Sequence, residues 1–117
     1  MFRFESLDIW RKAIETAEKL LDVADELEGK KLFRFAEQLR AAALSMPNNI
    51  AEGSGSGSKG EFGRFIGYAR CSAFENANMI IIFARRNYID TSRKDELLAE
   101  LDRLCCMLTS FRRSLSS

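Results

Sequence analysis

The sequence has no histidine, one proline, three cysteines and one valine among its 117 residues. Without histidine the chain cannot form a Ser-His-Asp triad, an imidazole proton relay or a histidine-ligated metal site. Valine and threonine are scarce, whereas alanine and leucine each occur 13 times, which disfavours β-sheet and favours α-helix. The composition therefore predicts an all-α protein, with no catalytic residues, metal site or cofactor.

The cysteines are Cys71, Cys105 and Cys106. Their odd number, the lack of a C-x-x-C spacing and the lack of histidine argue against both a disulfide framework and a zinc site. We expect reduced thiols in the core. The N-terminal residues have no signal-peptide pattern, and the longest uninterrupted apolar run, residues 79–84, is too short to span a membrane. We therefore expect a cytoplasmic protein with no membrane partner.

Apolar residues recur every three or four positions in four segments, as one face of a helix requires. This spacing predicts helices over about residues 7–28, 31–52, 59–88 and 92–115. In the last segment a heptad seam favours nearly parallel helix packing, and its members are Leu97, Leu101, Leu104, Leu108, Phe111 and Leu115. Helices of similar length with short connections predict an antiparallel up-down-up-down four-helix bundle, in one domain of residues 1–117.

Residues at the segment ends have helix-capping chemistry. We expect Ser6 or Asp8 to cap the first helix and Gly29 to end it in a left-handed conformation. Asp90 and its two successors supply caps for the fourth helix. Pro47, inside the second segment, predicts a kink.

The stretch Gly53–Gly60 reads GSGSGSKG and predicts a loop. Ser58 and Glu61 fit a capping box at the start of the third helix. The G-x-G-x-x-G match at 55–60 follows a helix and not a strand, so a flexible connection is favoured over a dinucleotide site. The alternative is a helix N-terminus where Lys59 and free amides hold a phosphate of a larger ligand.

The third segment has more apolar surface than one bundle core needs. Residues 79–83 are apolar all round, which suggests a subunit interface. The candidate interface residues are Phe74, Met79, Ile81 and Ile82. The alternative is that the N-terminal segment, Phe2–Phe4, covers this surface within the same chain.

The net charge of +1 conceals an uneven distribution: −4 in residues 1–28, +4 in residues 29–90 and +1 in residues 91–117. A basic surface can contact nucleic-acid phosphates while Tyr68 or Tyr88 stacks on bases. The candidate nucleic-acid-binding residues are Lys30, Lys31, Arg34, Lys59, Arg64, Arg85 and Arg86. Two alternatives remain: ordinary solvated faces, or basic and acidic faces that dock between subunits.

Several strings resemble one known family. The stretch 38–53 ends in Asn-Ile-Ala-Glu-Gly and resembles the signature of the four-helix-bundle proteins encoded in intervening sequences of bacterial 23S rRNA genes. Residues 7–13 and 61–65 are similar to the family's opening and to the start of its third helix. Residues 69–75 are similar to its Ala-x-Gly-Ser-x-x-Glu, with Cys71 in place of the usual glycine.

This resemblance implies a homopentameric ring with no known enzyme activity, often labelled ribosome-associated. It also implies a relationship to accessory variability proteins of diversity-generating retroelements, which bind nucleic acid and a nucleic-acid enzyme, a reverse transcriptase. We interpret the signature residues as mainly structural. They are Arg40, Ser45, Asn49, Glu52, Gly53, Ser72 and Glu75. The predicted function is binding of RNA or of an RNA-associated protein, and the alternative is a protein-interaction scaffold without a nucleic-acid role.

Overall fold

The computed structural model describes residues 1–116. A short 3₁₀ helix, η1 (Arg3–Ser6), precedes four α-helices, and the described residues contain no strand. The helices are α1 (Asp8–Gly29), α2 (Phe33–Ser54), α3 (Lys59–Arg85) and α4 (Thr91–Leu115). The all-helical prediction is confirmed, and the molecule measures 45 × 23 × 20 Å.

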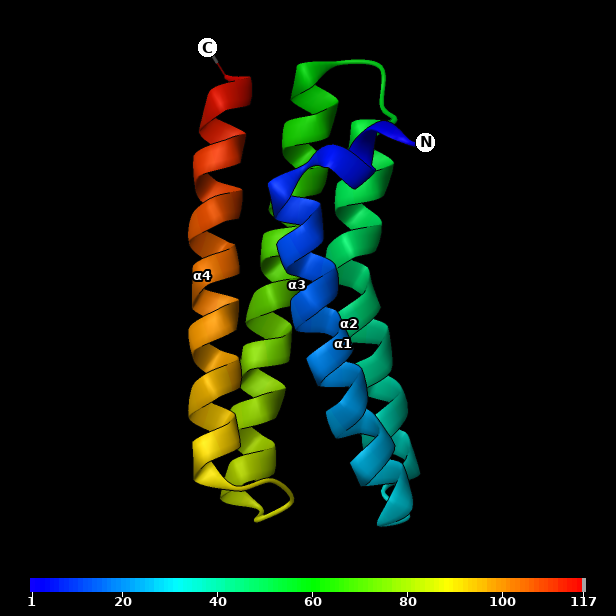
Figure 1. The fold of residues 1–117 in the computed structure, drawn as a ribbon, viewed down its shortest axis with the longest axis vertical. Helices are drawn as coiled ribbons and strands as arrows, with labels where there is room; N and C mark the ends of the chain where they lie inside the picture. Colours follow the sequence, from blue (N-terminus) through cyan, green and yellow to red (C-terminus); the bar gives the residue numbers. More distant parts are fainter. Residues whose placement is uncertain (117) are drawn as a thin grey trace.

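The four helices lie side by side along the long axis (Figure 1). The α1–α2 and α3–α4 connections lie at one end of the bundle, and the α2–α3 connection lies at the other, together with both chain termini. The closest helix neighbours are α1 with α2, α2 with α3, and α3 with α4, whereas α1 and α4 approach each other less closely. The fold is a four-helix bundle with one loosely closed side.

Each helix buries one stripe of side chains in a shared core, because its apolar residues repeat at the helical period. The predicted seam of α4 is confirmed at its first four leucines, which are at most 2% exposed, whereas Phe111 and Leu115 are only partly buried. Two polar side chains, Thr16 of α1 and Asn76 of α3, are also fully buried. The largest buried side chains are Leu20, Leu27, Leu39, Met46, Ile50, Ile66, Ile80, Leu97, Leu101, Leu104, Leu108 and Val23.

The predicted bounds of α1 are correct to within one residue, but the predicted capping residues are wrong. Its N-cap is Leu7, which makes no side-chain capping bond, so neither Ser6 nor Asp8 has that role. Gly29 stays helical, and Lys31 adopts the left-handed conformation, with φ of 65°. The amide of Leu32 donates to the carbonyl of Leu27 at 2.9 Å, which is the Schellman closure. The turn therefore places its left-handed residue two positions later than the glycine.

The predicted capping residues of α3 and α4 are confirmed, although the Glu61 carboxylate binds Arg64 and does not complete the predicted capping box. Ser58 Oγ accepts a hydrogen bond from the amide of Glu61 at 3.1 Å, and Asp90 Oδ1 accepts one from the amide of Arg93 at 2.7 Å. The glycine-rich connection is shorter than predicted, because α2 continues through Ser54. In turn α3 ends at Arg85, three residues earlier than expected.

The expected burial of the thiols is wrong for two of the three cysteines. Cys71 and Cys106 are exposed and Cys105 is half-buried, and all three are free thiols. Cys71 precedes buried Ser72 on α3 and therefore points away from the core. No helix within residues 1–116 is long and apolar enough to cross a membrane.

Candidate functional site

The seven basic candidates divide between the two ends of the bundle. Lys30, Lys31 and Arg34 lie at the α1–α2 connection, and Arg85 and Arg86 lie at the end of α3, near the α3–α4 connection (Figure 1). All five side chains are exposed. The remaining two, Lys59 and Arg64, lie on the first turns of α3 at the opposite end. The five residues that the fold gathers, together with Phe33, Phe35 and Tyr88, are called the basic end below.

Tyr88 is the centre of the basic end. Its carbonyl oxygen accepts a hydrogen bond from Lys30 Nζ at 2.6 Å. The guanidinium carbon of Arg86 lies 6.0 Å from its ring centroid, and the ring of Phe35 lies 6.1 Å away. Phe33 is 57% exposed. The basic end thus combines cationic groups with aromatic rings, the combination that binds the phosphates and bases of single-stranded nucleic acid.

The acidic residues of α1 near this end are occupied by other partners. Arg40 Nη2 lies 2.7 Å from Asp25 Oδ1, and Arg40 Nη1 lies 2.9 Å from Glu28 Oε1, which joins α2 to α1. These bonds raise the pKa of Arg40. Glu26 pairs with Arg93 of α4. Within residues 1–116, Lys31, Arg34 and Arg85 have no ion-pair partner, so their charges remain available to a ligand.

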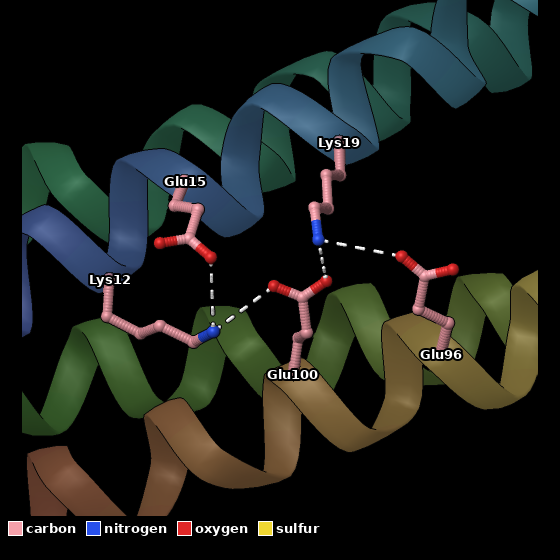
Figure 2. A network of polar contacts seen from close by, with 5 residues as sticks. All are labelled: Lys12, Glu15, Lys19, Glu96 and Glu100. Atoms are coloured by element: carbon pink, nitrogen blue, oxygen red, sulfur yellow. Dashed lines mark hydrogen bonds and ion pairs between the residues drawn. The ribbon is translucent and has the colours of Figure 1, made fainter.

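A separate network joins α1 to α4 along the loosely closed side (Figure 2). The carboxylate of Glu100 on α4 forms ion pairs with two lysines of α1. Its Oε1 lies 3.1 Å from Lys12 Nζ, and its Oε2 lies 2.5 Å from Lys19 Nζ. Lys12 also lies 3.5 Å from Glu15, and Lys19 lies 3.5 Å from Glu96. Burial alone would raise the pKa of Glu100, but the hydrogen bonds from both lysines outweigh it, and the pKa lies below its ordinary value. This network is structural, because it holds two helices together.

The signature residues of α2 and α3 meet at the contact between these helices. Ser45 Oγ and Ser72 Oγ are hydrogen-bonded at 2.7 Å. Asn49 Nδ2 donates to the carbonyl of Ser45 at 2.8 Å and to its hydroxyl at 3.0 Å. Asn76 Nδ2 donates to the carbonyls of Ala42, at 2.9 Å, and Ser72, at 2.8 Å. Two of these bonds, Ser45 to Ser72 and Asn76 to Ala42, cross between α2 and α3, whereas the others lie within one helix.

Gly53 is a packing requirement. A Cβ at this position would lie 2.7 Å from Cβ of Phe65 and 2.9 Å from Cδ1 of Phe62, so α2 and α3 can approach this closely only without a side chain. Glu52 and Glu75 are exposed, and their carboxylates make no hydrogen bond or ion pair within residues 1–116. The signature therefore includes two carboxylates for which the fold of the single chain shows no role.

The apolar surplus of α3 is exposed in the single chain. Phe74 is 57%, Ile81 42% and Ile82 46% exposed, whereas Met79 packs partly against the core. The alternative in which Phe2–Phe4 covers this surface is wrong. The N-terminal segment contacts α1 and α2 at the opposite end of the bundle (Figure 1).

The structure separates one predicted residue from the basic end and adds a feature that the sequence did not show. Tyr68, proposed there as a stacking residue, lies in the first half of α3, edge-on to Phe65 and away from the basic end. Arg70, Arg112 and Arg113 line a hollow between α3 and α4 that no sequence pattern assigned. The adjacent arginines at 112 and 113 were a possible signal, but their meeting with Arg70 depends on the packing of the two helices.

Comparisons with known proteins identify the family by its sequence model and the fold by a solved structure. A family model described as 23S rRNA-intervening sequence protein matches residues 5–110. The chain is also similar to the crystal structure of a protein of unknown function from the S23 ribosomal protein family of Bacteroides thetaiotaomicron. The TM-score is 0.84 at 19% identity, over 89% of this chain and 97% of that chain, which shows a shared fold. No curated protein sequence matches significantly.

Proposed function

Since the chain belongs to the 23S rRNA-intervening sequence protein family, we propose that it is a non-enzymatic protein that binds RNA through the basic end. The observation that carries this proposal is the presence of five exposed cationic side chains at the end of the bundle that also holds Phe33, Phe35 and Tyr88, where Lys30 and Arg86 contact Tyr88. The family name supports RNA as the polyanion. If the protein does not bind RNA itself, the proposed ligand of the basic end is an RNA-associated protein.

The charge arrangement favours a phosphate ligand. Nearby acids of α1 are already paired with Arg40 and Arg93, so they do not neutralise Lys31, Arg34 or Arg85. Cationic groups near a polyanion release its counterions, which gives binding that weakens with salt. The exposed ring of Phe33, between Lys31 and Arg34 in the chain, offers a stacking surface that accepts any base. The proposed contact is therefore with single-stranded RNA, without strict sequence preference.

The proposal includes self-assembly. We infer a homopentameric ring of antiparallel, up-down-up-down subunits, in which Ile81 and Ile82 are covered by a neighbouring copy and the candidate residue Phe74 stays open. The two isoleucines are each more than two-fifths exposed on one helix, which supports an interface there. A ring would present five basic ends, so a modest affinity of each would add up on one RNA strand.

The test is a salt titration of binding to a fluorescently labelled 20-nucleotide single-stranded RNA. The variant Lys31→Gln/Arg34→Gln/Arg85→Gln should weaken binding and reduce the slope of log K against log salt by about 2, at about 0.7 for each lost phosphate contact. The matched control, Lys59→Gln/Arg64→Gln, removes cationic side chains from the opposite end and should change little. Equal loss in both variants would contradict the assignment to the basic end.

The second candidate function is a protein-interaction scaffold, and the exposed apolar residues of α3 favour it. Undetectable RNA binding at about 50 mM salt, where phosphate contacts are strong, would support the scaffold and reject RNA binding. Analytical ultracentrifugation tests self-assembly independently of RNA binding. Ile82→Lys should dissociate the oligomer, whereas a monomeric mass for the unsubstituted protein would contradict the ring.

A further inference from the structure

Between α3 and α4, on the outside of the bundle, lie two adjoining hollows that share residues Arg70, Thr109 and Arg113. The one nearer the chain termini has a volume of about 390 Å³, and its lining within residues 1–116 contains no carboxylate. The other has a volume of about 650 Å³ and is mainly apolar. The first is lined by Ile66, Gly67, Arg70, Leu108, Thr109, Arg112, Arg113 and Ser116. Together they form one groove with a cationic part and an apolar part.

The cationic part is shaped by glycines on α3. A Cβ at Gly67 would lie 2.7 Å from Nη1 of Arg112 and 3.2 Å from its Cζ, so the guanidinium rests directly on the glycine backbone. One turn earlier, a Cβ at Gly63 would lie 3.8 Å from Cγ of Arg112. The two glycines thus form a shallow track that holds the Arg112 side chain against α3.

The three guanidinium groups of this part lack an anionic partner. Within residues 1–116, Arg70, Arg112 and Arg113 form no ion pair, although the chain has ten close ion-pair contacts elsewhere. Each guanidinium carries five N–H donors in a planar fork that matches phosphate oxygens. Thr109 and Ser116 add hydroxyl groups to the lining. Three converging arginines suit a di- or triphosphate better than a single carboxylate.

The apolar part adjoins the cationic part at Arg70 and Arg113, which line both. The Arg70 guanidinium carbon lies 5.0 Å from the ring centroid of Phe74, so a cation–π contact marks the boundary. The exposed ring of Phe74 and the side chains of Ala77 and Leu98 line the apolar part, and Asp102 is its one carboxylate. An aromatic wall beside cationic groups fits a flat heterocycle linked to phosphate.

We propose that this groove binds a nucleoside di- or triphosphate, with the phosphates at Arg70, Arg112 and Arg113 and the base in the apolar part against Phe74. Each of the two hollows falls in the volume range of small-ligand sites. The site lies on a different surface from the basic end, so it does not depend on RNA binding there. A free nucleotide and the phosphorylated end of an RNA strand share this chemistry, and the experiment must separate them.

Isothermal titration calorimetry with ADP, pyrophosphate and adenosine tests the assignment. ADP should bind with a dissociation constant at least ten-fold lower than that of either fragment, because only ADP fills both parts. Arg112→Gln/Arg113→Gln should abolish binding, and Gly67→Ala should weaken it by displacing the guanidinium. Lys59→Gln/Arg64→Gln is the matched control and should bind normally. Circular dichroism establishes that each variant is folded.

The cysteines provide a second measurement. Cys106 is exposed and lines the apolar part, whereas Cys71 is exposed and lies outside both hollows. Burial raises the pKa of the Cys105 thiol, so Cys106 is the better reporter of the groove. ADP should slow alkylation of Cys106 by iodoacetamide several-fold and leave Cys71 unchanged, as measured by mass spectrometry.

Three results would overturn the proposal: no ADP binding at millimolar concentration, equal affinity for ADP and pyrophosphate, or unchanged binding in the double arginine variant. Binding of decanoate but not of ADP would also reject it, in favour of a fatty-acid ligand. If a 5′-phosphorylated RNA hexamer displaces ADP and its 5′-hydroxyl form does not, the source is an RNA end. Loss of RNA binding through the basic end with ADP binding intact would reject the proposed function alone.

Discussion

The ammonium group of Lys19 on α1 lies 2.5 Å from Oε2 of Glu100 on α4. The other oxygen of that carboxylate accepts Lys12 Nζ at 3.1 Å, so one side chain of α4 holds two of α1. Only 12% of the Glu100 side chain is exposed, which keeps water from replacing these bonds. Because α1 and α4 are the least closely packed neighbours, this shared carboxylate contributes much of what joins them.

Replacing Glu100 with glutamine should lower the free energy of unfolding by about 1–2 kcal/mol. The change removes a charge-assisted bond while two lysines remain beside the neutral amide. The measurement is urea unfolding followed by circular dichroism. Glu96→Gln is the matched control on the same helix, and it should cost much less, because the Glu96 side chain is 63% exposed.

The same network predicts how stability depends on pH. The folded pKa of Glu100 is below its unfolded value, so its contribution is complete above the unfolded pKa and is lost as pH falls through the folded pKa. The stability difference between the unsubstituted protein and Glu100→Gln should therefore be constant near pH 7 and shrink below about pH 4. A difference that grows on acidification would contradict the depressed pKa.

Lys19 should make the stability of the protein depend on pH in the alkaline range. Its hydrogen bond to Glu100 raises its pKa, so the contribution is complete below the unfolded pKa and is lost as pH rises through the folded one. Comparing the unsubstituted protein with Lys19→Met from pH 8 to 11 should show the difference disappearing only above about pH 10.

Gly53→Ala should destabilise the protein by about 1–3 kcal/mol, because the added methyl group would overlap Phe65 and Phe62. Gly29→Ala is the matched control. Gly29 is also a helical glycine, but a Cβ there meets nothing within 4 Å, so alanine should be neutral or slightly stabilising. Thermal unfolding of the two variants gives the comparison, and equal destabilisation would reject the packing explanation.

Ser45 and Ser72 should be energetically coupled. A double-mutant cycle with Ser45→Ala and Ser72→Ala should give a coupling free energy of about 0.5–1.5 kcal/mol, the net value of one hydrogen bond. Asn49→Ala should couple to Ser45→Ala in the same way, through its bond to the Ser45 hydroxyl. Strict additivity of the single changes would show that the two helices do not depend on this network.

Local pattern was enough to predict the secondary structure but not all of its ends. The leucine seam of α4 and the cap at Ser58 follow from spacing and side-chain chemistry within a few residues. The end of α1 does not, because the Schellman turn forms where Leu32 can reach the Leu27 carbonyl. A left-handed lysine at position 31 is accepted there although a glycine was available two residues earlier.

Predictions of the site were incomplete wherever they depended on contacts between residues far apart in the sequence. The net charge of residues 29–90 identified a basic segment, yet it could not show that Lys59 and Arg64 lie at the opposite end from the other five candidates. Asn76 has the spacing of a core residue, but a polar side chain is not expected in the core. The structure shows that its amide donates a hydrogen bond to the carbonyl of Ala42. In both cases the missing information was which helix lies opposite.

By itself the sequence determined the helical class, the core-facing stripes of leucine and alanine, and the family signature, because each depends on residues within a few turns of one another. Only the tertiary structure decided which charges are neutralised and which remain free. Arg40 meets two acids of α1, whereas Arg70, Arg112 and Arg113 line one hollow from two helices and have no ion-pair partner within residues 1–116. The physical reason is that charge interactions act through space over a few ångströms, and side-by-side packing brings together residues that are far apart in the chain.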